Sequence, residues 1–164
     1  MTRVLGVDPG LAATGWGVVD ADGSRNSYVA HGTIDTPAAD QLGARLSKIY
    51  DELTAVVRSY NPAAAGIEQL YFARNTSSAL PVAHARGVVL LGLEQRSVAA
   101  FEYPPQEIKQ SIVGSGRATK EQVQEMVRVL LGLNEVPKPN HSADALAAAL
   151  CHIAHAGAME RFGV

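Results

Sequence analysis

Four side chains able to bind metals or transfer protons lie where predicted strands and helices begin or end. Asp8 closes a short apolar run at an Asp-Pro-Gly turn, and Glu68 closes another apolar run. His141 and Asp144 are three residues apart, a spacing that puts both on one face of a helix. Carboxylates that approach one another repel, and divalent cations such as Mg²⁺ or Mn²⁺ relieve that repulsion. The four residues together predict a metal site, with Asp8 as the candidate bridging ligand.

The chemistry expected of such a site is phosphodiester hydrolysis. Two metal ions about 3.5–4 Å apart activate the attacking water and stabilise the departing oxygen. His141 has two possible roles, as a metal ligand or as the general base toward the water. Each residue alone also has a simpler explanation, since Asp-Pro-Gly is a common turn, Glu68 could end a solvated strand, and acids suit helix N-termini. Their joint occurrence favours the metal site.

The N-terminal half predicts the elements that carry Asp8 and Glu68. Apolar runs and alternation predict strands at 3–8, 14–19 and 27–34, with Asp22-Gly23 as a hairpin turn. Apolar residues at spacings of three and four then predict a helix over 42–60, which Asn61-Pro62 ends. Residues 63–68 predict a buried strand ending at Glu68.

The C-terminal half predicts the helix that carries His141 and Asp144. We expect a helix over 78–95, a strand over 98–103, a helix that begins at Thr119 with a Thr119–Gln122 capping box, and a last helix over 141–155. Three consecutive strands followed by alternation predict an α/β fold with a five-stranded mixed sheet, an antiparallel meander followed by parallel strands. That order is typical of the RNase H-like fold. We expect one domain over 1–156 and a frayed tail over 157–164.

Composition sets outer limits on the function. The chain has 164 residues, a formal net charge of −2 and a single cysteine, Cys151, which excludes an intrachain disulfide and a multi-cysteine zinc site. We expect a cytoplasmic protein without a membrane span or signal peptide. The slightly acidic balance disfavours nucleic-acid binding on average, but 69–93 and 108–120 contain basic and no acidic residues.

Several motifs in order give the chain a resemblance to the RuvC family of bacterial Holliday-junction resolvases over nearly its whole length. They are Val7-Asp8-Pro9-Gly10, Thr14-Gly15-Trp16-Gly17, Ile67-Glu68-Gln69, Ala85-Arg86-Gly87, Val113-Gly114-Ser115-Gly116 and His141-Ser142-Ala143-Asp144-Ala145. The resemblance implies a metal-dependent endonuclease that cuts four-way DNA junctions in recombination and repair. It assigns the catalytic metal site to Asp8, Glu68, His141 and Asp144. Many members have aspartate at the position of His141, and because imidazole suits Mn²⁺ better than Mg²⁺, we expect Mn²⁺ to be favoured.

The resemblance also implies DNA contacts outside the metal site. An aromatic residue at the position of Tyr71 is expected to stack on bases near the crossover. Lys109 and Lys120 match lysines that contact DNA in the family, and Arg74 and Arg117 are weaker candidates for the same role. Phosphate contacts of this kind give affinity without sequence preference.

Partners follow from the same resemblance. The family acts as a homodimer, which suits the two-fold symmetry of a four-way junction. The helix around Arg86 to Leu93 is the expected interface, where Gly87 and Gly92 would permit close approach, although plain core packing explains these glycines as well. The RuvA–RuvB branch-migration complex is a further expected partner.

Three other functions compete with this interpretation. A YqgF-type RNase H-like nuclease would act in RNA processing, and a comparison of junction and structured-RNA cleavage would discriminate. An actin-like nucleotide-binding module shares the Asp-Pro-Gly opening, but it needs about twice this length. A junction binder without catalysis leaves the acidic set unexplained.

Overall fold

Five strands form one mixed sheet in the computed structural model, which describes residues 1–69 and 76–162. The sheet order is β3-β2-β1-β4-β5. Strands β1, β2 and β3 are antiparallel neighbours, and β4 and β5 extend the sheet in parallel beside β1. The strands are β1 (Thr2–Asp8), β2 (Ala13–Asp22), β3 (Arg25–Asp35), β4 (Ala64–Glu68) and β5 (Ala99–Tyr103). The predicted meander and parallel strands are confirmed.

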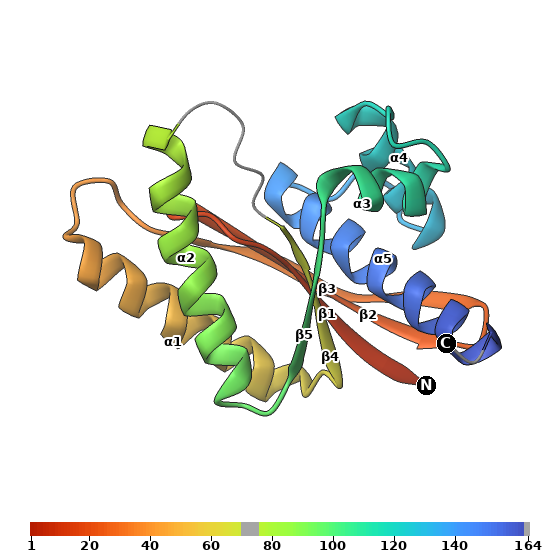
Figure 1. The fold of residues 1–164 in the computed structure, drawn as a ribbon, viewed down its shortest axis with the longest axis horizontal. Helices are drawn as coiled ribbons and strands as arrows, with labels where there is room; N and C mark the ends of the chain where they lie inside the picture. The colour runs from red at the N-terminus through yellow and green to blue at the C-terminus, as the bar shows by residue number, and fades with distance from the viewer. Residues whose placement is uncertain (70–75, 163–164) are drawn as a thin grey trace.

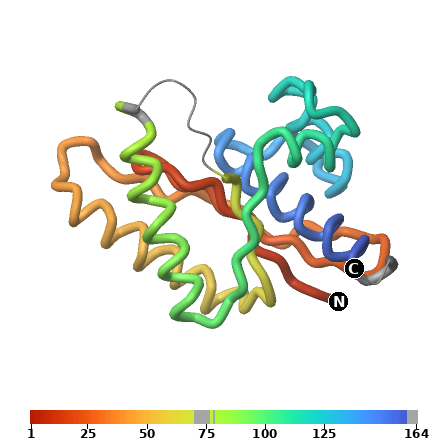
Figure 2. Tube along the Cα trace, in the orientation of Figure 1, coloured from red at the N-terminus to blue at the C-terminus, as the bar shows by residue number. Residues whose placement is uncertain are grey.

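The helices cover the two faces of the sheet unequally (Figure 1). Helices α1 (Leu42–Tyr60) and α2 (Thr76–Glu94) run side by side on one face, as Figure 2 also shows. Helix α5 (Asn140–Phe162) crosses the other face, with α3 (Pro105–Val113) and α4 (Lys120–Leu130) packed against it. Each face has its own hydrophobic cluster, so the sheet separates two cores.

Two elements differ from the sequence-based expectation. Helix α3 was not predicted, because it is short and its two leading prolines resemble a loop; Pro105 instead occupies the first helical turn, where a missing N–H costs nothing. Helix α5 includes residues 157–162, which had been assigned to a frayed tail. The helix therefore continues beyond Ala156.

Alternation along β1 decides which face receives Asp8. Leu5 and Val7 belong to the cluster beneath α1 and α2, and Val4 belongs to the cluster beneath α5. Because successive strand residues point to opposite faces, Gly6 and Asp8 lie on the α5 side. The carboxylate of Asp8 therefore emerges where α5 begins.

Helix α5 packs closely on the sheet because glycines form the surface beneath it. We call these glycines the glycine floor. Gly6 pairs with Gly17 on one side and Gly66 on the other, which makes a row of three glycines across the central strands. A Cβ at Gly6 would lie 1.7 Å from the carbonyl oxygen of Ala145, and one at Gly15 would lie 2.0 Å from that of His141. These distances leave no room for a side chain, so the glycines set the height of α5 above the sheet.

None of the helices within residues 1–69 and 76–162 has the length and apolar character needed to cross a bilayer.

The glycine floor predicts a large stability loss for Gly6→Ala. The added methyl would overlap the backbone of α5, which cannot move without separating the helix from the sheet, so we expect a loss of about 3 kcal/mol or more in the free energy of unfolding. Urea denaturation followed by circular dichroism measures it. Gly43→Ala in α1 is the control, since nothing lies within 4 Å of its Cβ position, and it should change stability by about 1 kcal/mol or less. Equal stability of the two variants would contradict the proposed floor.

Candidate metal centre

Three elements bring the predicted acidic residues to one point at the end of the sheet. Asp8 ends β1 and Glu68 ends β4, the parallel neighbour of β1. Both carboxylates therefore lie at the C-terminal ends of adjacent strands. His141 and Asp144 belong to the first turns of α5. One ligand atom from each of Asp8, His141 and Asp144 lies within 4.8 Å of the others. The cluster has the donor types and spacing of a divalent-cation site.

The hydrogen bond between His141 and Asp8 fixes the imidazole ring. Its Nδ1 lies 2.8 Å from Oδ2 of Asp8. This hydrogen bond raises the pKa of His141, and the negative charges of Asp8 and Asp144 act in the same direction, against partial burial. With a proton on Nδ1, the neutral ring has its lone pair on Nε2, which can accept a proton or bind a metal.

Burial and the neighbouring carboxylates together disfavour the charged form of Glu68. Burial is the largest cause that raises its pKa, to about 8, followed by the charges of Asp8 and Asp144 and a hydrogen bond with Asp8. Burial also raises the pKa of Asp144, although Lys120 opposes that shift. The site therefore contains more potential negative charge than its own surroundings neutralise, a condition that a bound cation relieves.

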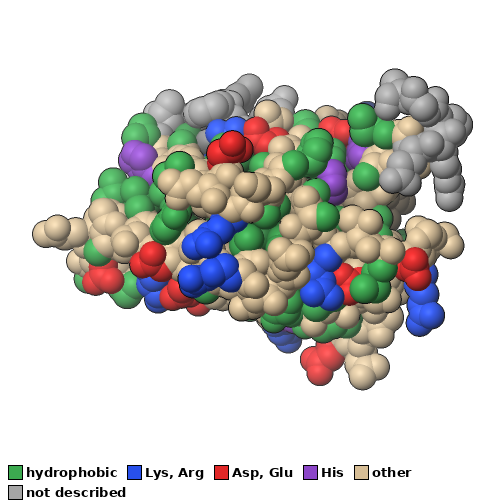
Figure 3. Space-filling view, turned by 90° about the horizontal axis from the view of Figure 1, so that it is seen from below, with side chains coloured by type: hydrophobic (Ala, Val, Ile, Leu, Met, Phe, Trp, Pro, Cys, Tyr) green, Lys and Arg blue, Asp and Glu red, His purple; other side chains and the backbone are tan. Residues whose placement is uncertain are grey.

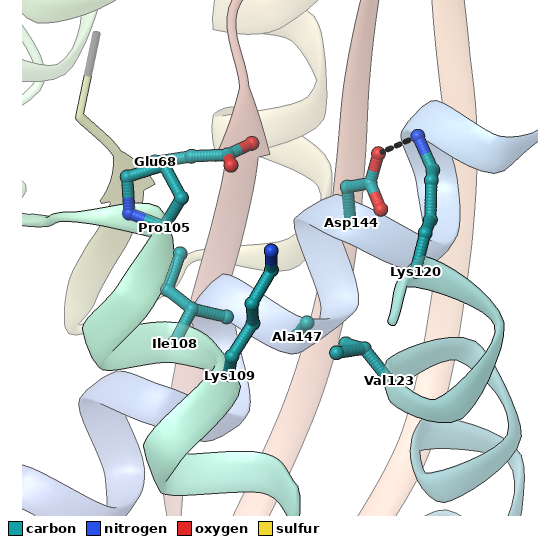
Figure 4. Close-up of a pocket in the computed structure, with 8 residues that line it drawn as sticks. All are labelled: Glu68, Pro105, Ile108, Lys109, Lys120, Val123, Asp144 and Ala147. Atoms are coloured by element: carbon teal, nitrogen blue, oxygen red, sulfur yellow. Dashed lines mark ion pairs between the residues drawn. The ribbon is translucent and has the colours of Figure 1, made fainter. Parts of the chain in front are cut away.

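Two lysines from the neighbouring helices enter the same site. Lys120 forms an ion pair with Asp144, with 3.0 Å between Nζ and Oδ2. Lys109, from α3, directs its ammonium toward the space between Glu68 and Asp144 (Figure 4). The two lysines and the two acids line a cavity of about 220 Å³, which also has an apolar wall formed by Pro105, Ile108, Val123 and Ala147. A negatively charged ligand in this cavity would thus meet positive charge beside the acidic cluster.

Local sequence explains why this helical hairpin presents both lysines. Helix α3 ends at Gly114, whose φ of 83° is in the left-handed region that favours glycine. The Gln110 side chain donates a hydrogen bond to the Gly114 carbonyl and stabilises the turn. The predicted Thr119–Gln122 capping box is present and begins α4, so Lys120 occupies its first turn.

The remaining predicted DNA contacts are less well placed by the structure. Tyr71 and Arg74 lie outside the described residues. Arg117 is exposed in the turn between α3 and α4. Arg86, which contributes to the first basic stretch, is already engaged, since it donates two 2.6 Å hydrogen bonds to Glu102. Only part of the predicted basic character is therefore available near the site.

Sequence reasoning missed the contribution of α3 to the site. Pro105 and Ile108 line the cavity, yet the segment between β5 and Thr119 was not assigned to a helix. The Pro104-Pro105 pair, followed by Ile108 and Ile112 four residues apart, was an available helix-start signal. The pairing of Lys120 with Asp144 had no local signal, because the residues belong to different helices.

Charge on another side of the molecule is mixed. On the face shown in Figure 3, Lys and Arg side chains are interspersed with Asp and Glu side chains among the described residues. A polyanion binds best to a continuous basic surface. That face therefore lacks the charge pattern expected for DNA, in contrast to the two lysines that meet at the acidic cluster.

Comparisons with known proteins agree on one family. The family model described as "Crossover junction endodeoxyribonuclease RuvC" matches residues 4–152. A RuvC of Chloroflexus aggregans is 46% identical over 162 residues, covering 99% of each chain. A RuvC of Rubrobacter xylanophilus is 48% identical over 149 residues, covering 91% of this chain and 83% of the relative.

Solved structures give the same result at the level of the fold. Thermus thermophilus RuvC, in complex with a Holliday junction substrate, superposes with a TM-score of 0.92 at 34% identity, covering 96% of each chain. The yeast mitochondrial Holliday junction resolvase Ydc2 has a TM-score of 0.69 at 15% identity and shares the fold. From its sequence match, its architecture and the position of its acidic cluster, this chain belongs to the RuvC family of crossover junction endodeoxyribonucleases.

Proposed function

We propose that this protein resolves four-way (Holliday) DNA junctions by metal-dependent cleavage of phosphodiester bonds, in recombination and repair. The observation that carries the proposal is the convergence of Asp8, His141 and Asp144 within 4.8 Å, beside Glu68, in a chain of this family. The Thermus relative, described with a Holliday junction substrate, supports the choice of DNA.

Asp8, Glu68, His141 and Asp144 are the proposed metal ligands. Their oxygen and nitrogen ligand atoms fit Mg²⁺ or Mn²⁺. The raised pKa of Glu68 supports the proposal, because a bound cation would stabilise its carboxylate. Bound as a pair, such ions would supply Lewis-acid stabilisation and a more acidic water. Asp8 is the proposed bridging ligand, because it contacts His141 directly and influences the pKa of both Glu68 and Asp144.

The residues of the chain itself orient the reacting groups. The Asp8 carboxylate holds the His141 ring with Nε2 available, either as a ligand or as the acceptor of the proton from the attacking water. Both roles need the neutral imidazole, so both predict lower activity as pH falls through the raised pKa of His141.

Lysines beside the carboxylates are the proposed phosphate contacts. Lys109 and Lys120 line the cavity next to Glu68 and Asp144, where they would attract and hold the DNA backbone. Tyr71 is proposed to stack on bases near the crossover, and Arg74 and Arg117 are proposed as further phosphate contacts.

A homodimer would provide two such sites for one junction. The proposed interface is the exposed face of α2, where Leu80 and Leu91 are 60% and 51% exposed and Gly87 has no neighbour within 4 Å of its Cβ position. Spacings of seven and four residues place these three on one side of the helix. Gly92, also expected there, instead packs on α1 near Thr54 and Tyr50. The RuvA–RuvB complex is the proposed cellular partner, and the cytoplasm is the proposed location.

The alternative of a YqgF-type nuclease in RNA processing is less well supported. The family model and the relatives named above are all RuvC crossover junction endodeoxyribonucleases. A direct comparison of substrates tests the choice.

A synthetic four-way junction should be cut by paired, symmetric nicks on two opposed strands. Linear duplex and structured RNA should remain intact, because neither offers the four-way crossover at which the two sites of the proposed dimer would reach opposed strands. Asp8→Asn should reduce cleavage at least about 10³-fold by removing the bridging carboxylate while junction binding persists. Denaturing gels of end-labelled strands measure both nicks.

Three results of that experiment would contradict the proposal in different ways. Binding without cleavage by the wild-type protein would indicate a junction-binding module. Preferential cleavage of structured RNA would favour the RNA-processing alternative. Single nicks that never become paired would argue against the homodimer.

Mn²⁺ should support junction cleavage at lower concentration than Mg²⁺, because the imidazole of His141 is a better ligand for Mn²⁺. Half-maximal rates in parallel metal titrations measure the difference. His141→Asp is the matched variant, and it should narrow the gap between the two metals. Equal or better activity in Mg²⁺ for the wild-type protein would count against His141 as a ligand.

Metal binding should release protons near neutral pH. Because the pKa of Glu68 is raised to about 8 and that of His141 is raised as well, the metal-free site holds protons at pH 7 that bound cations would expel. Mn²⁺ affinity should therefore rise with pH and level off above about 8, with release of between about one and two protons per protein at pH 7. Calorimetry in buffers of different ionisation enthalpy measures the release.

Glu68→Gln is the control for this proton release. It removes the carboxyl group with the raised pKa, so the proton count at pH 7 should fall by most of one proton. Release that is absent in the wild-type protein, or unchanged in the variant, would contradict the assignment.

A further inference from the structure

We propose that Lys120 is an internal counter-ion of the metal centre, which holds Asp144 in the metal-free protein and is displaced when a divalent cation binds. This inference rests on the proposed function, because it takes Asp144 to be a metal ligand. Its starting observation is the 3.0 Å contact between Nζ of Lys120 and Oδ2 of Asp144, drawn as a dashed line in Figure 4. The ammonium thus already contacts one of the two carboxylate oxygens that Asp144 can offer to a cation.

The two side chains of this ion pair differ in their exposure to solvent. The side chain of Lys120 is 51% exposed, whereas that of Asp144 is 20% exposed. A lysine that leaves the pair regains water at once, but the carboxylate left behind needs another cation. The pair is therefore easily exchanged for a metal ion, yet it keeps Asp144 compensated until one arrives.

The backbone of Lys120 can stay in place during this exchange. The Thr119–Gln122 capping box fixes the first turn of α4 through hydrogen bonds of 2.8 and 3.2 Å. The four-carbon side chain is flexible, so only its rotamer must change. The released ammonium would remain at the mouth of the cavity that Lys109 also lines. A phosphate bound there would meet two lysines instead of one.

Lys109 differs from Lys120 in that it does not pair with a carboxylate among the described residues. It lines the same cavity and directs its ammonium into it, but among residues 1–69 and 76–162 no carboxylate lies at ion-pair distance from it. Its positive charge opposes metal binding only through the general field of the site. Lys120 opposes it by that field and also by direct contact with a carboxylate oxygen of Asp144, a proposed ligand. Binding of metal and binding of DNA phosphate would consequently favour each other through Lys120.

The test is a titration of the protein with Mn²⁺ in the absence of DNA. Calorimetry, or the electron paramagnetic resonance signal of free Mn²⁺, measures the binding. We expect Lys120→Met to bind Mn²⁺ roughly three- to tenfold more tightly than the wild-type protein, because the competing cation is gone. Lys109→Met is the matched control, with the same change of charge from the same helical hairpin, and its affinity should rise by less than about twofold. Lys120→Arg keeps the competitor and should bind like the wild-type protein. Circular dichroism verifies that each variant is folded.

Each other result overturns the proposal in a recognisable way. Equal gains for Lys120→Met and Lys109→Met would show that Lys120 acts only as a nearby charge. Weaker Mn²⁺ binding by Lys120→Met would show that the lysine supports the metal site. Failure of the wild-type protein and of every variant to bind Mn²⁺ would overturn the metal centre itself, whereas the junction-cleavage experiment tests the proposed function independently of Lys120.

Discussion

The close contact between α5 and the sheet is the constraint on which the rest of this structure depends. Three glycines side by side on β2, β1 and β4 leave the space that the backbone of α5 and the side chain of Leu146 fill. The buried alanines of α5 complete the fit from the other side. Because Asp8 follows Gly6 by two residues, the same contact that packs the core brings its carboxylate to the first turn of α5. The packing of α5 on the sheet therefore also sets the position of Asp8 in the site.

That closeness has an electrostatic consequence. Carboxylates from β1, β4 and α5 share a small, partly buried volume, and burial together with mutual repulsion raises the pKa of Glu68 to about 8. Other side chains compensate these carboxylates: the imidazole of His141 hydrogen-bonds to Asp8, the ammonium of Lys120 pairs with Asp144, and Lys109 lies nearby. A site that recruits its own cations in this way is suited to exchange them for metal ions and then for a polyanionic substrate.

The two faces of the sheet carry different parts of the molecule. The α5 face holds the acidic cluster and the lysines of the α3–α4 hairpin, and the opposite face holds α1 and α2. Arg86 of α2 pairs with Glu102 of β5, a strand parallel to the one that ends at Glu68. The exposed side of α2 is therefore anchored to the same sheet as the site, so a second subunit bound there would be held in a fixed relation to the chemistry.

The sequence by itself determined the strands of the meander, the amphipathic helix α1 and the capping box of α4, because these follow from short-range periodicity and local hydrogen bonding. It also suggested the acidic residues as a set, through their positions at the ends of predicted elements. It also indicated the family through motifs in order. It did not reveal α3, where paired prolines obscured a short helix, or the helical residues 157–162. Only the tertiary structure decided that Gly6, Gly17 and Gly66 form one row, that Lys120 pairs with Asp144, and that Gly92 faces α1. Those contacts join residues far apart in the chain, and no local pattern records which distant side chain will fill a given space.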